Sequence, residues 1–105
     1  MEGKENRKTV TLCGASSYEQ KYYFNQQFQS LPENIKKELQ AMCVLFTEDV
    51  GGILTLEFEP DGTLEFKVRA DDHDYLFDEI GCGLKIRQYQ REKRELLEAL
   101  ELFYR

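Results

Sequence analysis

Histidine and cysteine are scarce in this 105-residue sequence, which contains one histidine and three cysteines. An odd number of cysteines without a Cys-x-x-Cys pair does not fit a disulfide framework or a cysteine-based zinc site. Catalytic zinc and iron sites normally draw on more than one histidine. We therefore expect no cofactor, and we expect the protein to work in a reducing compartment.

Long apolar runs are also absent. No stretch approaches the ~18 apolar residues that suggest a membrane span. Residues 1–8 carry charges of both signs and no apolar block follows them, which does not fit a secretory signal. These absences predict a cytoplasmic protein without a membrane partner.

Basic residues are few in the middle of the chain. The formal net charge is −6, and residues 48–79 hold eleven acidic residues against two basic ones. Because such a region repels phosphate backbones, we do not expect nucleic-acid binding. The same charge would suit a basic protein partner, or would simply keep a small protein soluble.

What is present suffices for one folded domain. The chain is 41% hydrophobic and has seven Phe and six Tyr. A chain of this length can bury a single core without metal or disulfide staples. We predict a flexible tail over residues 1–8 and one domain over residues 9–105.

The first third of the chain predicts a strand followed by a helix. Residues 9–13 alternate and include β-branched side chains, which favours a short strand. Ser16 and Ser17 each have Glu or Gln three residues on, a capping-box pattern. This pattern predicts a helix over residues 18–30.

Two further helices follow from the spacing of apolar residues. A repeat of three and four residues predicts a helix that begins at Pro32 and ends at the pair Gly51-Gly52. A similar repeat predicts a last helix over residues 84–104, after a break at residues 81–83.

The clearest pattern is a β-hairpin closed by residues 60–62, Pro-Asp-Gly. Apolar and polar residues alternate on both sides of it, which is typical of two half-buried strands. Closure on three loop residues leaves every apolar side chain on one face. It predicts the pairs Phe58 with Leu64, Leu56 with Phe66, and Leu54 with Val68.

These elements predict an α+β fold in which helices pack on one face of a small two- or three-stranded antiparallel sheet, in the order (β)-α-α-β-β-α. Residues 10–13 would supply the third strand. The other face would be polar. There Glu57 lies opposite Glu65, a mildly unfavourable pair that either suits a basic partner or is simply solvated.

Cys13 is the first candidate site residue. A thiol between a strand and a helix lies near the helix N-terminus, where backbone N–H groups stabilise a thiolate. Residues 13–16, Cys-Gly-Ala-Ser, also resemble the Cys-Gly-x-Ser motif of single-cysteine glutaredoxins, but the chain lacks the accompanying cis-proline. The loop from Cys13 to Ser17 would therefore carry thiol chemistry, bind an anion, or serve as an ordinary helix cap.

Tyrosines of the predicted first helix form the second candidate. Tyr18 and Tyr22 would lie one helical turn apart, with Tyr23 to the side. Tyrosine is favoured in protein recognition because it offers a large contact area at little entropic cost. These side chains predict either a recognition patch or part of the core.

The acidic segment around the single histidine is the third candidate. Its oxygen and nitrogen ligands would come from Asp72, His73, Asp74 and Asp78. The EF-hand pattern fails, because Phe77 and Gly83 stand where that loop needs Gly and Glu. A solvated acidic loop is the alternative.

Three segments resemble one known family: Leu-Cys-Gly-Ala-Ser-Ser-Tyr-Glu-Gln-Lys-Tyr-Tyr-Phe at residues 12–24, Phe-Thr-Glu-Asp-Val-Gly-Gly-Ile-Leu-Thr-Leu-Glu-Phe at 46–58, and Asp-Glu-Ile-Gly-Cys-Gly-Leu-Lys at 78–85. Together they are similar to an uncharacterised family of small acidic bacterial proteins from anaerobic Firmicutes. The resemblance implies a bacterial cytoplasm. It carries no assigned activity and therefore no functional residue.

We therefore expect a non-enzymatic protein-binding or regulatory module, because no complete nucleophile–base set and no cofactor motif is present. The partner would be another protein or a second copy of the chain. The alternative is a thiol-dependent or anion-binding activity centred on residues 13–17. The candidate binding residues are Ser16, Ser17, Tyr18, Tyr22, Tyr23, Glu57 and Glu65.

Overall fold

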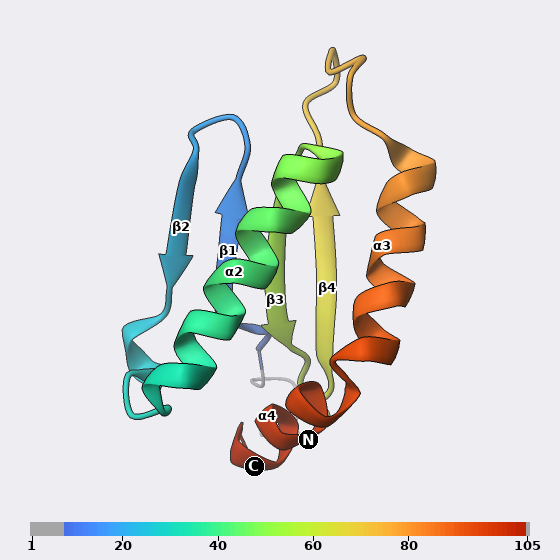
Figure 1. The fold of residues 1–105 in the computed structure, drawn as a ribbon. Coiled ribbons are helices and arrows are strands. Elements are labelled where there is room, and N and C mark those ends of the chain that lie inside the picture. The colour runs from blue at the N-terminus through green and yellow to red at the C-terminus, as the bar shows by residue number, and fades with distance from the viewer. Residues whose placement is uncertain (1–7, 105) are drawn as a thin grey trace.

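The computed structural model describes residues 8–104 and is built around a four-stranded antiparallel sheet (Figure 1). The predicted tail lies outside these residues except for Lys8. The strand order is β2-β1-β3-β4. The elements are β1 (Val10–Ser16), β2 (Lys21–Phe24), the 3-10 turn η1 (Gln26–Phe28), α2 (Glu33–Val50), β3 (Ile53–Phe58), β4 (Leu64–Arg69), α3 (Glu79–Glu92) and α4 (Arg94–Tyr104).

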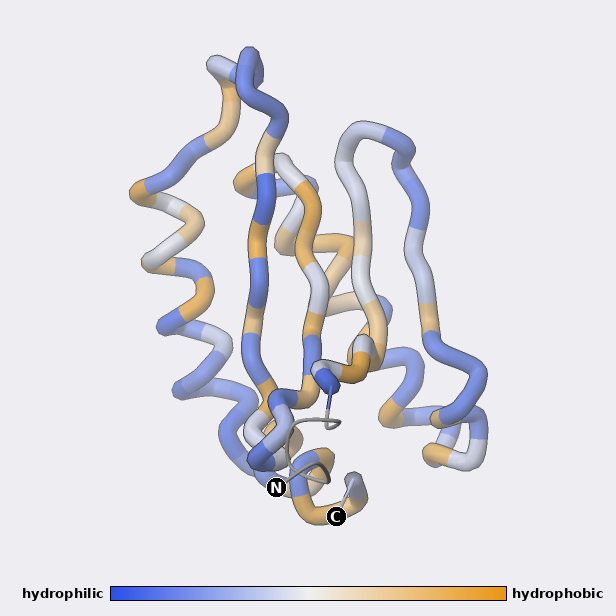
Figure 2. Tube along the Cα trace, turned by 180° about the vertical axis from the view of Figure 1, so that it is seen from behind, coloured by the Kyte–Doolittle hydropathy of each residue, from blue (hydrophilic) through white to orange (hydrophobic). Residues whose placement is uncertain are grey.

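The α+β class is confirmed, but the sheet is larger than predicted. Helix α2 crosses one face of the sheet diagonally, and in the view from behind none of the helices formed by the described residues covers the opposite face (Figures 1 and 2). The prediction of two or three strands in the order (β)-α-α-β-β-α is wrong, because the order is β-β-α-β-β-α-α. The strand predicted at residues 10–13 exists and extends to Ser16.

The predicted hairpin is confirmed in its register. Phe58 pairs with Leu64, Leu56 with Phe66, and Leu54 with Val68. The Glu59 N–H donates to the Thr63 carbonyl at 2.7 Å, and Gly62 supplies the positive φ of 94° that closes the turn. Strict alternation fixed this register, since a slip of one residue would expose the apolar side chains of one strand.

The helix predicted over residues 18–30 is wrong. Residues 17–20 turn, and the next four residues form β2, which pairs with β1. The Ser16 hydroxyl accepts a hydrogen bond from the Glu19 N–H at 3.2 Å, so the capping pattern closes a turn instead of starting a helix. Gln20, with φ of 53°, then reverses the chain into Lys-Tyr-Tyr-Phe, whose aromatic residues favour a strand.

Helix α2 is confirmed and ends at Gly51, whose φ is 83°. The predicted last helix is wrong at its start and is divided at Lys93. The Asp78 carboxylate accepts the Gly81 N–H at 2.8 Å and caps α3, so residues 81–83 lie inside the helix instead of breaking it. Beyond Lys93, α4 turns below the sheet, where the Tyr104 ring stacks on Phe58 at 4.2 Å.

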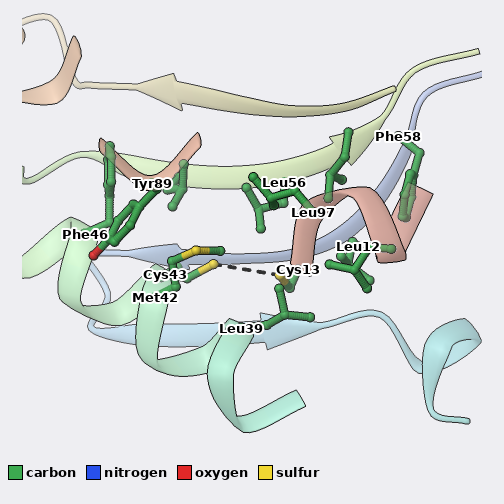
Figure 3. Packing of buried hydrophobic residues seen from close by; sticks show 14 of the residues in the cluster. Leu12, Cys13, Leu39, Met42, Cys43, Phe46, Leu56, Phe58, Tyr89 and Leu97 are labelled. Carbon is green, nitrogen blue, oxygen red and sulfur yellow. Dashed lines mark hydrogen bonds between the residues drawn. The ribbon is translucent and has the colours of Figure 1, made fainter. Parts of the chain in front are cut away.

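The core lies between the sheet and α2 (Figure 3). Leu12 and Cys13 of β1 meet Leu39 and Cys43 of α2, and all four side chains are fully buried. The Cys13 and Cys43 sulfur atoms lie 3.8 Å apart. Within residues 8–104, no helix combines the length and apolar character needed to cross a membrane.

Candidate functional site

A cavity of about 790 Å³ opens between α2 and the β1–β2 hairpin; we call it the hairpin cavity. Its position follows from the diagonal path of α2. The helix begins beside η1 and ends over β3 and β4, so the end of β1 and the start of β2 are left without a helix over them (Figure 1). A volume of this size lies within the range of about 300–1,000 Å³ that ligand pockets occupy.

The wall of the hairpin cavity combines small, apolar and tyrosine side chains. Leu76 stands at its rim with 94% of its surface exposed, although the surrounding connection is mostly polar. Leu76 therefore adds accessible apolar surface beside the cavity. The lining includes Ala15, Ser16, Ser17, Tyr18, Lys21, Tyr22, Gln40, Val44, Thr47, Glu48, Asp49, Asp74 and Leu76.

Tyr18 holds two walls of the cavity together. Its hydroxyl donates to the Asp74 carboxylate at 2.6 Å and accepts the Asp71 N–H at 2.9 Å. The hydrogen bond to Asp74 raises the pKa of Tyr18 above its ordinary value. The turn after β1 is thereby tied to the segment after β4, more than fifty residues later in the chain.

Tyr22 contributes a buried hydroxyl to the same region. No hydrogen-bond partner is present for this hydroxyl among residues 8–104. Burial raises the pKa of Tyr22 strongly, and the neighbouring Cys13 thiol adds to the shift. Because a thiol is only a weak hydrogen-bonding group, the Tyr22 hydroxyl can still form a hydrogen bond with a stronger donor or acceptor.

The charge around the cavity is mainly negative. Glu48, Asp49 and Asp74 line it, against Lys21 as the one cation among the lining residues that lie within 8–104. Asp49 is partly neutralised by Lys85 at 2.9 Å, and Asp74 is engaged by Tyr18. The lining therefore favours a ligand with positive charge or with several N–H donors.

Five of the residues selected from the sequence line this cavity: Ser16, Ser17, Tyr18, Tyr22 and Asp74. Tyr23 does not join them. Strand alternation turns Tyr22 and Tyr23 to opposite faces of the sheet, and Tyr23 lies beside Gly14 with 56% of its surface exposed. Val44 and Leu76 were not selected, because only the three-dimensional paths of α2 and of the connection between β4 and α3 bring them to the site.

Glu57 and Glu65 are paired across the open face, as predicted. Other side chains of the same chain offset the repulsion between these two carboxylates. Lys67 lies 3.4 Å from Glu57 and 2.6 Å from Glu59, and the Thr55 hydroxyl donates to Glu57 at 2.7 Å. The open face therefore already carries a basic side chain, Lys67, beside these carboxylates.

Cys13 lacks the surroundings that the thiol alternative requires. It lies inside β1 with none of its surface exposed, and the following helix is not formed. Its neighbour Cys43 has a pKa well above the ordinary value, first because of the hydrogen bond to Cys13 and then because of burial. Thiolate chemistry is not favoured in such a site.

In the acidic segment around His73, two of the candidate carboxylates already form hydrogen bonds within the chain. Asp74 accepts hydrogen bonds from Tyr18 and from the Leu76 N–H, and Asp78 caps α3. Asp72 and His73 complete no ligand set: among residues 8–104, no three acidic, cysteine or histidine side chains are grouped closely enough to hold a metal ion.

Comparison with known proteins identifies one family. Its model matches residues 9–105, which is nearly the whole chain, and it is described as a family of unknown function. No curated protein matches the chain, and no solved structure matches it. The chain belongs to DUF6145, a family of unknown function.

Proposed function

We propose that this chain is a non-enzymatic protein-binding module of the bacterial cytoplasm, and that the hairpin cavity is its binding site. The observation that carries the proposal is the cavity itself, lined by Tyr18 and Tyr22 and bordered by the exposed Leu76. Tyrosine and exposed apolar side chains around a concave surface are typical of protein recognition. The cytoplasmic location rests on the sequence composition and the family resemblance.

The lining defines the chemistry of the partner. An apolar side chain of the partner would contact Val44 and Leu76, while a Lys or Arg beside it would face Glu48 and Asp74. Opposite charges at the edge of such a contact raise the association rate and select the partner. We therefore propose a partner segment that combines one apolar side chain with a neighbouring basic residue.

The proposal is tested with two neighbouring positions on α2. Val44 lines the cavity, whereas Leu45 is exposed and does not. Tagged wild-type protein, Val44→Arg and Leu45→Arg would each be used to capture proteins from the source organism, with quantitative mass spectrometry. We expect a partner that binds wild type and Leu45→Arg and is lost with Val44→Arg, while circular dichroism shows that both variants are folded.

A competing location is tested in the same experiment. The double variant Glu57→Lys with Glu65→Lys changes only the open strand face. If this variant loses the partner and Val44→Arg keeps it, the binding site is on the strand face and the cavity proposal is wrong.

A further inference from the structure

The outer edge of β2 carries backbone groups that are not used inside the chain. The Asn25 N–H donates to the Leu12 carbonyl at 2.9 Å, so the backbone groups of Tyr23 and Lys21 also point to β1. Tyr22 and Phe24 therefore direct their N–H and C=O groups outward. Within residues 8–104 these two N–H and two C=O groups have no hydrogen-bond partner, and no element flanks β2 on this side (Figures 1 and 2).

The opposite edge of the sheet, formed by β4, is in contact with α3 and α4. On β4, the outward N–H of Leu64 donates to the Glu101 carboxylate of α4 at 2.8 Å. The Phe66 ring packs on Tyr89 of α3 at 6.5 Å, and α3 runs beside this strand (Figure 1). An unprotected strand edge is a template for another strand, so β2 is the edge available for pairing.

The surroundings of β2 suit a second copy of this acidic chain. Residues 20–29 contain a single charged residue, Lys21, in a protein of net charge −6. The strand and turn themselves therefore bring few like charges together when two copies meet, and Lys36 of α2, at the same edge, is paired with Glu33 at 3.5 Å. A charged residue in the middle of an edge strand would block pairing, but Lys21 is the first residue of β2.

We propose that two copies of this chain pair through their β2 strands in antiparallel orientation, about a two-fold axis at Tyr23, to form one continuous sheet. In this register Tyr22 of one copy faces Phe24 of the other, and Lys21 faces Asn25. The outward groups of Tyr22 and Phe24 then form four hydrogen bonds, so that every free group named above is paired.

The side chains support this register on both faces. Tyr23 is exposed on the open face and would meet its own counterpart, an aromatic pair of the kind that stabilises antiparallel strands. On the helix face, a hollow of about 260 Å³ borders the edge, and its lining includes Tyr22 and Phe24 of β2 together with Glu33, Lys36, Lys37 and Gln40 of α2. In the proposed register, Tyr22 of one copy and Phe24 of the other would lie side by side along this hollow.

Sedimentation equilibrium of the full chain, from about 1 μM to 1 mM, tests the proposal. We expect a monomer–dimer equilibrium. Tyr23→Lys puts two ammonium groups opposite each other and should raise the dissociation constant about tenfold or more. Leu102→Lys, an exposed apolar residue of α4, is the control and should leave it unchanged. A monomer at every concentration, or a dimer that tolerates Tyr23→Lys, overturns the proposal.

A cross-linking experiment does not depend on the charged variant. Residues opposite each other in a non-hydrogen-bonded pair have Cα atoms about 4.5 Å apart, within reach of a disulfide. Diamide oxidation of Tyr23→Cys should give covalent dimers, whereas Lys21→Cys, which faces Asn25, should not. Equal cross-linking of the two variants, or none in Tyr23→Cys, rejects the register.

The dimer proposal and the cavity proposal can be rejected independently of each other, because different variants test them. The Tyr23 side chain lies on the open face, and the hairpin cavity lies on the helix face. Loss of self-association in Tyr23→Lys therefore leaves Val44 and its neighbours untouched.

Discussion

The sulfur atoms of Cys13 and Cys43 lie 3.8 Å apart in the core, and neither side chain has any exposed surface. The contact joins β1 to α2, the two elements that hold the hairpin cavity between them. Small thiols at these positions let the helix approach the sheet closely. Both thiols thus pack in the core as small apolar side chains do.

The first prediction concerns thiol reactivity. With iodoacetamide at neutral pH, Cys13 and Cys43 should react only as fast as the protein unfolds, because both are buried. Mass spectrometry of each cysteine across a urea titration measures this. Alkylation of native Cys13 at the rate of a free thiol would restore the thiol-dependent alternative.

The second prediction concerns stability at high pH. The pKa values of Cys43 and Tyr22 are raised from ordinary values of 9.0 and 10.0, so the folded state favours their protonated forms. Above pH 9 the unfolded chain loses these protons first, and the free energy of unfolding must fall as pH rises. Urea denaturation between pH 7 and 11 measures the fall, and Tyr22→Phe should reduce it above pH 10. A flat profile contradicts the buried position of these groups.

The hairpin and α2 could be predicted because their sequence patterns have one physical solution. Alternation from Leu54 to Val68 leaves one register that buries all apolar side chains. The spacing along α2 ends at Gly51, which accepts a positive φ. In both elements the local pattern and the packing agree.

The strand β2 could not be predicted from local signals, because its decisive contacts are with β1. The capping pattern at Ser16 fits a turn as well as a helix, and only pairing with residues 13–16 decides between them. The site follows the same rule. Ser16 and Tyr22 were selected for helix positions but lie in adjacent strands, where Ser16 pairs with Lys21 and Tyr22 with Ala15, while Val44 and Leu76 come from distant segments.

The third prediction concerns the buried hydroxyl of Tyr22. Tyr22→Phe removes a polar group without a partner, so the free energy of unfolding should rise by about 1 kcal/mol. Tyr23→Phe, on the open face, should leave stability unchanged. If a partner binds this hydroxyl, the same Tyr22→Phe variant should bind it more weakly, an opposite change in stability and affinity that calorimetry can measure. Destabilisation by Tyr22→Phe would show that the hydroxyl has a strong internal partner.

The fourth prediction concerns the link between the turn after β1 and the segment after β4. Tyr18→Phe removes the hydrogen bonds to Asp71 and Asp74. Hydrogen exchange of the Asp71 amide should become faster, with no change in the strands. Tyr75→Phe is the matched control, because Tyr75 lies in the same segment and is exposed. Equal exchange in both variants would show that Tyr18 does not hold this wall of the cavity.

The fifth prediction separates two glycines by their surroundings. A Cβ at Gly14 would lie 2.7 Å from the Leu54 carbonyl oxygen, and backbone in the middle of a sheet cannot move away at low cost. A Cβ at Gly83, inside α3, meets only the end of Arg87 at 4.0 Å. Gly14→Ala should therefore lower the free energy of unfolding by about 1–3 kcal/mol, whereas Gly83→Ala should raise it by about 0.5–1 kcal/mol. Thermal and urea denaturation of both variants measures the difference. Because β1 lies between β2 and β3, Gly14→Ala should also weaken both partner binding at the hairpin cavity and self-association through β2. Gly83→Ala should leave both kinds of binding as in the wild type.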